Sequence, residues 1–202
     1  YKLIGLIDYG LGNINSFINI LKLFEKDFRV VSKVSDFNNL SKIILPGVGS
    51  FDKAISLLDS RKFKDPLNEK ALVEKIPILG ICVGMQIMAK FSEEGRLNGL
   101  GWINENVRHL NNKMNLPVPH MGWNDVALKT QIDIFENIEN LKFYFLHSYY
   151  FSVTNNLNKQ AITNYGLDFV SAFQVKNIYG IQFHPEKSHS NGIKLLNNFC
   201  NL

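Results

Sequence analysis

Two short motifs from distant parts of the chain could together perform nucleophilic chemistry. Cys82 stands in a G-x-C-x-G pattern over residues 80–84, and His184 and Glu186 stand in the segment His-Pro-Glu. A cysteine can supply the nucleophile, a histidine the base, and a carboxylate the group that orients the base. The residue types therefore predict a Cys-His-Glu triad.

The pattern around Cys82 is typical of a nucleophile elbow, in which a strand turns sharply into a helix. The apolar run 76–81 predicts a buried strand, and residues 83–91 predict a helix. Glycines two positions before and after the cysteine would relieve the crowding that a Cβ atom causes in such a strained turn. A helix N-terminus also stabilises a thiolate. The competing interpretation of this motif alone is a buried structural cysteine.

The His-x-Glu spacing favours the catalytic interpretation. Residues 179–183 predict a strand that runs into His184. In an extended chain, residues i and i+2 share a face, so Glu186 could hold one imidazole nitrogen while the other faces Cys82. A strand-end histidine beside a solvated glutamate is the alternative.

The segment Pro46-Gly47-Val48-Gly49 could complete such a site. It follows a predicted strand over 42–45, and its glycines would let backbone N–H groups turn toward an oxyanion. An ordinary glycine turn is the alternative, because proline and glycine are common turn residues.

The elements that must position these residues alternate in the first ninety residues and shorten afterwards. Strands are predicted over 3–7, 28–31, 42–45 and 78–81, and helices over 13–24, 52–58, 66–75 and 83–91. Later strands are predicted over 126–128, 142–146, 149–153, 161–163, 169–173 and 178–183, before a helix over 192–200; residues 111–115 and 155–159 read as polar turns. The pattern predicts an α/β fold with a doubly wound, mixed, mainly parallel sheet. We expect one domain over residues 1–202, with ligands beyond the carboxyl ends of the strands.

Composition excludes several functional classes. The chain has 202 residues, 46% hydrophobic and 20% charged, with a net charge of +4 that is too diffuse to indicate nucleic-acid binding. The two cysteines, Cys82 and Cys200, predict no disulfide framework and favour a reduced, cytoplasmic setting. We expect no secretory signal, because the apolar run 3–7 is only five residues long, and no membrane span, because the apolar run 76–89 is too short. No ligand spacing indicates a metal site, and no cofactor is expected.

Five segments give the chain a specific resemblance: residues 7–13, 46–49, 119–124, 145–150 and 180–188. The elbow, the His-Pro-Glu segment and the turn over 46–49 together resemble the class I (triad) glutamine amidotransferases, from the first strand to the last helix. Residues 7–13, 46–49, 119–124 and 145–150 carry a closer resemblance, to the glutaminase subunits of imidazole glycerol phosphate synthases of histidine biosynthesis, and residues 180–188 also fit. Of these, 119–124 and 145–150 are the most selective. Val83 departs from the leucine usual in this family, with little expected effect because its backbone N–H is the working group.

The resemblance implies a reaction and a role for each residue. Cys82 would attack the side-chain amide of glutamine, His184 would pass the proton to the leaving ammonia, and Glu186 would orient His184. A glutamyl thioester would form and hydrolyse to glutamate, with the N–H groups of Val48 and Val83 holding the oxyanion. The residues implied to contact glutamine are Gly49, Gln86, Ser148 and Tyr149.

The resemblance also implies a partner. Ammonia would pass to a separate (β/α)₈-barrel synthase subunit, in a heterodimer whose interface includes Pro119, His120, Met121 and Trp123. No Gly-rich phosphate loop is left over in this chain for a phosphorylated acceptor. Three alternatives stay open: a paralogous amidotransferase subunit serving another synthase, for example in sugar amination for surface glycans; a non-catalytic scaffold on the same fold; and a cysteine peptidase or chaperone-like relative.

Overall fold

The N-terminal part of the chain forms parallel strands with helices between them. A computed structural model describes residues 2–110 and 116–202. The strands are β1 (Leu3–Ile7), β2 (Phe28–Val31), β3 (Leu40–Gly47) and β4 (Ile78–Cys82). The helices are α1 (Ile14–Leu23), α2 (Phe51–Ser60) and α3 (Lys64–Asn68), and α3 continues as one π-helical turn over Glu69–Val73.

The C-terminal part completes one mixed sheet. Strand β13 (Ile178–Ile181) pairs in parallel with β4, and β12 (Asp168–Val175) pairs antiparallel with β13. Beyond β12 follow β10 (Tyr149–Ser152), β6 (Asn106–His109) and β5 (Phe91–Ser92), while β11 (Lys159–Asn164) pairs with β12 and with β8 (Ala127–Leu128). The order β2-β1-β3-β4-β13-β12-β10-β6-β5 confirms the predicted mixed, mainly parallel doubly wound architecture.

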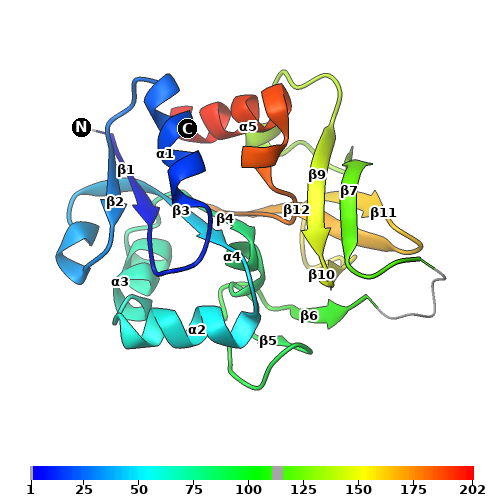
Figure 1. The fold of residues 1–202 in the computed structure, drawn as a ribbon, viewed down its shortest axis with the longest axis horizontal. Helices are drawn as coiled ribbons and strands as arrows, with labels where there is room; N and C mark the ends of the chain where they lie inside the picture. Colours follow the sequence, from blue (N-terminus) through cyan, green and yellow to red (C-terminus); the bar gives the residue numbers. More distant parts are fainter. Residues whose placement is uncertain (1, 111–115) are drawn as a thin grey trace.

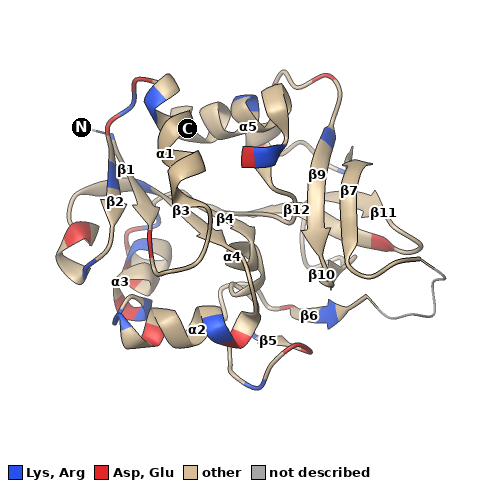
Figure 2. Cartoon of the chain, viewed as in Figure 1, with Lys and Arg blue, Asp and Glu red and all other residues tan. Residues whose placement is uncertain are grey.

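Helices cover both faces of the sheet, which explains the continuous apolar runs of its central strands. Figure 1 shows α1 and α5 (His189–Asn201) on one face, and α2 and α3 on the other. All five residues of β4 are buried. Figure 2 shows basic and acidic residues interspersed over the outer elements, whereas β4 and the short helix α4 (Val83–Gln86) carry none.

A second, two-stranded sheet stands beside the large one. Strands β7 (His120–Asp125) and β9 (Lys142–His147) pair antiparallel, with His120 opposite His147. Figure 1 shows this pair at the side of the molecule away from β1 and β2. No strand was predicted over residues 120–125, because they include polar residues and a glycine, but they form the regular strand β7.

Several predicted boundaries were wrong. The helix predicted over 83–91 ends at Gln86, because the next residues form hydrogen bonds with a distant backbone segment instead. The N–H of Leu100 donates to the carbonyl of Ile87, and that of Ile103 donates to the carbonyl of Met88. Strands β5 and β6 were not predicted, and β13 ends two residues before Phe183. The predicted turn over 111–115 lies outside the described residues. None of the helices seen in the described ranges combines the length and the apolarity that crossing a membrane requires.

Candidate active site

Cys82 lies at a strained turn between β4 and α4, as the elbow motif predicts. Its φ of 54° and ψ of −112° place it in a region that few non-glycine residues adopt. The two flanking glycines are required by close backbone approach. A Cβ atom at Gly80 would lie 2.5 Å from the carbonyl oxygen of Gly84, and one at Gly84 would run into the carbonyl oxygen of Leu45.

The segment after β3 leaves the sheet beside this elbow. In the parallel register Gly47 pairs with Cys82, so the next residues, Val48 and Val83, lie together at the carboxyl edge. Gly49 has a φ of +99°, which favours glycine. Because β3 extends through Gly47, the turn begins later than Pro46, where the sequence had placed it.

His184 and Glu186 contact each other in a way that differs from the expectation. Residues 185–187 form a 3₁₀ turn rather than an extended chain, and this turn brings Oε1 of Glu186 to 2.9 Å from Nδ1 of His184. Both side chains are almost fully buried. The backbone N–H of His184 donates to the carbonyl of Tyr144 at 2.8 Å, which anchors the ring beside β9.

The electrostatic surroundings of His184 favour its protonated form. Burial alone would favour the neutral ring, but the neighbouring Cys82 and the carboxylate of Glu186 act against it and raise the pKa of His184 to about 10. The buried Oε2 of Glu186 has no hydrogen-bond partner among the described residues. A protonated ring at neutral pH is the form that can donate a proton to a leaving group.

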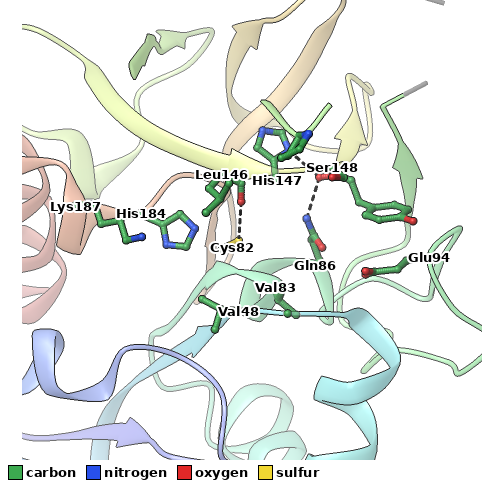
Figure 3. A pocket seen from close by; sticks show the side chains of 13 residues that line it. Val48, Cys82, Val83, Gln86, Glu94, Leu146, His147, Ser148, His184 and Lys187 are labelled. Atoms are coloured by element: carbon green, nitrogen blue, oxygen red, sulfur yellow. Dashed lines mark hydrogen bonds between the residues drawn. The ribbon is translucent and has the colours of Figure 1, made fainter. Parts of the chain in front are cut away.

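A pocket of about 300 Å³ opens over Cys82, and Figure 3 shows His184 and Gln86 on either side of the sulfur. The volume suits a small ligand. Nine predicted residues line it: Val48, Gly49, Cys82, Val83, Gln86, Pro119, Ser148, Tyr149 and His184. Four lining residues were not predicted: Glu94, Leu146, His147 and Lys187.

Almost the whole chain matches one known protein family. Residues 5–202 match the family model described as glutamine amidotransferase class-I. The chain belongs to the class I glutamine amidotransferases.

Curated relatives and solved structures agree with this membership. The amidotransferase is 45% identical to the imidazole glycerol phosphate synthase subunit HisH of Leptospira borgpetersenii, over 99% of this chain and 100% of that protein. It is 44% identical to the protein of the same name from Bdellovibrio bacteriovorus, over the same shares. The solved structure of PurLQS from Thermotoga maritima has the same fold, with a TM-score of 0.74, 17% identity and coverage of 99% of this chain and 98% of that one.

Gln86 of the amidotransferase is held firmly by its neighbours. Its Nε2 lies 2.9 Å from the carbonyl oxygen of Tyr149 and 2.9 Å from Oε1 of Gln182. Both N–H donors are therefore used within the protein, and only Oε1 is left for a ligand. Gln182, which the sequence did not single out, also places its Nε2 3.7 Å from Sγ of Cys82.

Two buried histidines support the opposite wall of the pocket. Nδ1 of His120 lies 3.0 Å from Nε2 of His147, whose Nδ1 lies 2.9 Å from the carbonyl oxygen of Tyr149. Burial lowers the pKa of His120 to about 4, and burial together with the neighbouring His120 lowers that of His147 to about 3. Both rings are neutral at physiological pH.

The residues predicted for a partner interface divide between two faces of β7. Met121 and Trp123 are 65% and 44% exposed. The ring of Trp123 stacks on that of His189, with the two ring centroids 5.2 Å apart. Strand alternation turns His120 inward, where it is 2% exposed, so its side chain faces the aromatic interior instead of the surface. Pro119 lines the pocket. Within residues 2–110 and 116–202, no group of three or more His, Cys, Asp or Glu residues is placed to hold a metal ion.

Proposed function

We propose that this amidotransferase is the glutaminase subunit of an imidazole glycerol phosphate synthase and acts in histidine biosynthesis. The observation that carries the proposal is the 45% identity to a subunit of that name over the full length of both chains. The geometry around Cys82 supports glutamine hydrolysis as its reaction. Its two free, buried cysteines favour a cytoplasmic location.

In the proposed first step, Sγ of Cys82 attacks the carboxamide carbon of glutamine. The carbonyl oxygen gains negative charge, and the backbone N–H groups of Val48 and Val83 donate hydrogen bonds to it. Support comes from the parallel register, which brings both residues to the same edge, one position beyond the Gly47–Cys82 pair. The N–H of Val83 also belongs to the first turn of α4, where backbone donors have no partner within a helix.

In the following steps, His184 transfers the proton that it took from the thiol of Cys82. It gives this proton to the leaving nitrogen, the C–N bond breaks, ammonia departs, and a glutamyl thioester remains on Cys82. His184 then takes a proton from the water that hydrolyses the thioester, and glutamate is released. Glu186 holds the ring in place throughout. The 2.9 Å contact and the raised pKa of His184 support these roles.

The pocket also offers a partner for the α-ammonium group of glutamine. Glu94 lines the pocket, and among the described residues only its Oε2 is used, as the acceptor of the Phe51 N–H at 2.8 Å. Burial raises the pKa of Glu94, so a bound cation would compensate a carboxylate that is poorly solvated. Gly49, Ser148 and Tyr149 would contact the rest of the substrate.

We place the partner, a (β/α)₈-barrel synthase in a heterodimer, against the exposed side of β7. Met121 and Trp123 are large apolar side chains on one face of this strand, and such residues are favoured anchors at interfaces. Glycines on both sides of Val48 allow its peptide to rotate, so partner binding could turn an oxyanion donor toward the site.

Glutamine turnover tests this proposal in three samples: the isolated chain, the complex with the barrel subunit, and the complex with the phosphorylated acceptor bound. An oxyanion donor is worth about 10²–10³ in rate, so we expect an increase of that order when the acceptor binds. Equal rates in all three samples would contradict the proposed rotation of the Val48 peptide.

The main alternative is a paralogous subunit that serves another synthase. Numbered relatives give it some support: one from Pseudomonas aeruginosa, 39% identical, is named imidazole glycerol phosphate synthase subunit HisH 2. Formation of imidazole glycerol phosphate by the reconstituted complex distinguishes the two functions. Activation only by a different synthase would favour the alternative.

A further inference from the structure

Gln182 is a wholly buried residue behind the nucleophile, and the proposed reaction has so far given it no role. Its side chain is 0% exposed and does not line the pocket. Its Nε2 lies 3.7 Å from Sγ of Cys82, and its Oε1 lies 2.9 Å from Nε2 of Gln86. It follows β13, which pairs directly with β4, the strand that ends at Cys82.

The direction of these hydrogen bonds follows from one backbone carbonyl. The oxygen of Tyr149 can only accept, so Gln86 must turn its Nε2 toward it. The second N–H of the same Nε2 then donates to Oε1 of Gln182. The amide of Gln182 is thereby oriented with its Nε2 toward the sulfur, because the opposite orientation would set two NH₂ groups against each other.

The Tyr149 carbonyl is itself fixed by the histidine pair. Nδ1 of His147 contacts this acceptor, so Nδ1 carries the hydrogen and Nε2 accepts from Nδ1 of His120. Nε2 of His120 in turn lies 3.2 Å from Nδ2 of Asn124, which donates to it. The donor and the acceptor are therefore determined in each hydrogen bond of the network that connects Asn124 with Cys82.

We propose that Gln182 donates a hydrogen bond to the sulfur of Cys82 and stabilises its thiolate for attack, with its orientation set by Gln86 and the Tyr149 carbonyl. A hydrogen bond to a charged group is stronger than one to a neutral group, so this contact favours the thiolate over the thiol. Gln182 does not line the pocket, so it acts on the sulfur directly and can affect the substrate only through Gln86, whose hydrogen bond it accepts. The inference rests on the proposed nucleophilic role of Cys82.

Alkylation of Cys82 by iodoacetamide tests the contact without glutamine or partner. The thiolate displaces iodide and forms an S–C bond, and mass spectrometry of the Cys82 peptide separates this reaction from any at Cys200. We expect Gln182→Met to react roughly 10- to 100-fold more slowly at pH 7, as the loss of a hydrogen bond to a charged group implies. Gln182→Glu keeps an acceptor for Gln86 but sets a carboxylate beside the sulfur, so it should react most slowly.

Two features separate this role from a general effect on the fold. The rates of both variants should approach wild type near pH 10, where a thiol ionises without assistance. In glutamine turnover by Gln182→Glu, which keeps the acceptor for Gln86, kcat should fall while KM changes little. Gln160→Met is the matched control, because Gln160 is a partly buried amide on β11 that donates to the carbonyl of Thr154, and it should alkylate like wild type.

Wild-type alkylation rates at pH 7 in both Gln182 variants would overturn the proposal. If neither variant folds, the NMR signals of the Gln182 side-chain amide decide: they should shift in Cys82→Ala, whereas those of Gln160 should not. Unshifted Gln182 signals would equally overturn it. Failure of the proposed function would look different, since wild type would then hydrolyse no glutamine although the alkylation difference remained.

Discussion

The two sides of the pocket are held in place by different kinds of interaction. On the elbow side, Cys82 and Val83 are fixed by backbone packing so close that Gly80 and Gly84 leave no space for a methyl group. On the opposite side, the backbone carbonyl of Tyr149 accepts hydrogen bonds from Gln86 and His147. That side continues into β7, which exposes Met121 and Trp123.

The difference indicates a division of labour. Closely packed interiors deform little, so the elbow keeps the nucleophile in one geometry at all times. A chain of hydrogen bonds can rearrange at lower cost than a packed backbone, so the Tyr149 side, like the glycine-flanked peptide of Val48, is one that a partner could adjust. The following predictions test this division, from the largest expected effect to the smallest.

Replacing the nucleophile should remove the chemistry of the elbow side and leave its packing intact. We expect Cys82→Ala to lose at least roughly 10⁴-fold in glutamine turnover, because triad members act as a unit. Thermal unfolding and partner binding should be preserved, and added ammonia should still support the synthase. Near-normal glutamine turnover in this variant would contradict the proposed role of Cys82.

Removing the charge behind His184 should have the next largest effect. Glu186→Gln is expected to lower kcat by up to roughly 10⁴-fold, because an amide can hold the ring in the wrong tautomer. Steady-state kinetics measures the loss. Glu74→Gln is a suitable control, since Glu74 forms an ion pair with Lys70, in the segment after α3. An unchanged kcat in Glu186→Gln would mean that the carboxylate is a bystander.

On the β7 side, truncating the exposed tryptophan should weaken partner binding without touching the chemistry. An aromatic anchor of this kind is worth about 2 kcal/mol, so we expect Trp123→Ala to raise by about 30-fold the Kd for the barrel partner. Calorimetry of the complex measures it. Leu23→Ala is the control, because Leu23 is an exposed apolar residue on α1, at a distance from β7. Equal affinities would place the interface elsewhere.

The buried histidine pair should make stability depend on pH. Histidine in an unfolded chain has a pKa of about 6.5, whereas burial keeps that of His147 at about 3. Below pH 6.5 the unfolded state therefore takes up protons that the folded ring refuses, and the free energy of unfolding falls as the pH falls. The limit is about 1.4 kcal/mol per pH unit for each such ring.

Urea titrations at pH 6.5 and pH 5 measure this slope. His184 partly offsets this slope, because its ring stays protonated in the folded state while the unfolded chain still titrates near pH 6.5; the offset is the same in wild type and in the variants below, so comparing them removes it. His147→Asn should show a smaller slope than wild type, whereas His109→Asn, at an exposed position, should not. The same slope in wild type and His147→Asn would contradict the assignment of neutral rings.

How far the sequence could predict the site follows the same division. The elbow was predictable because its requirement is local: a nucleophile between two glycines, after an apolar strand. The contact between His184 and Glu186 was also predicted, although through an extended chain rather than the 3₁₀ turn that forms. Pro185 is the first residue of this turn, and its ring fixes φ at a value that suits a helical turn.

The remaining parts depend on contacts that no short segment encodes. Strand β7 carries mostly polar or exposed residues, and its regularity comes from pairing with β9. The helix after the elbow stops at Gln86 because backbone groups near residues 99–105 compete for the following residues. Glu94 reaches the site only through the tertiary fold and carries no local pattern that could have revealed it. Gln182 stands two positions before His184, but its contacts with Gln86 and Cys82 come from distant parts of the chain.

The pairing of β4 with β13 also orders events during synthesis of the chain. Strands β1 to β4 pair among themselves, so the elbow can form soon after residue 82 has emerged from the ribosome. The strand that carries the polypeptide to Gln182 and His184 is translated last and adds beside β4 only then. An incomplete chain thus holds Cys82 without His184. Under the proposed mechanism, the active site is complete only once β13 has been added beside β4.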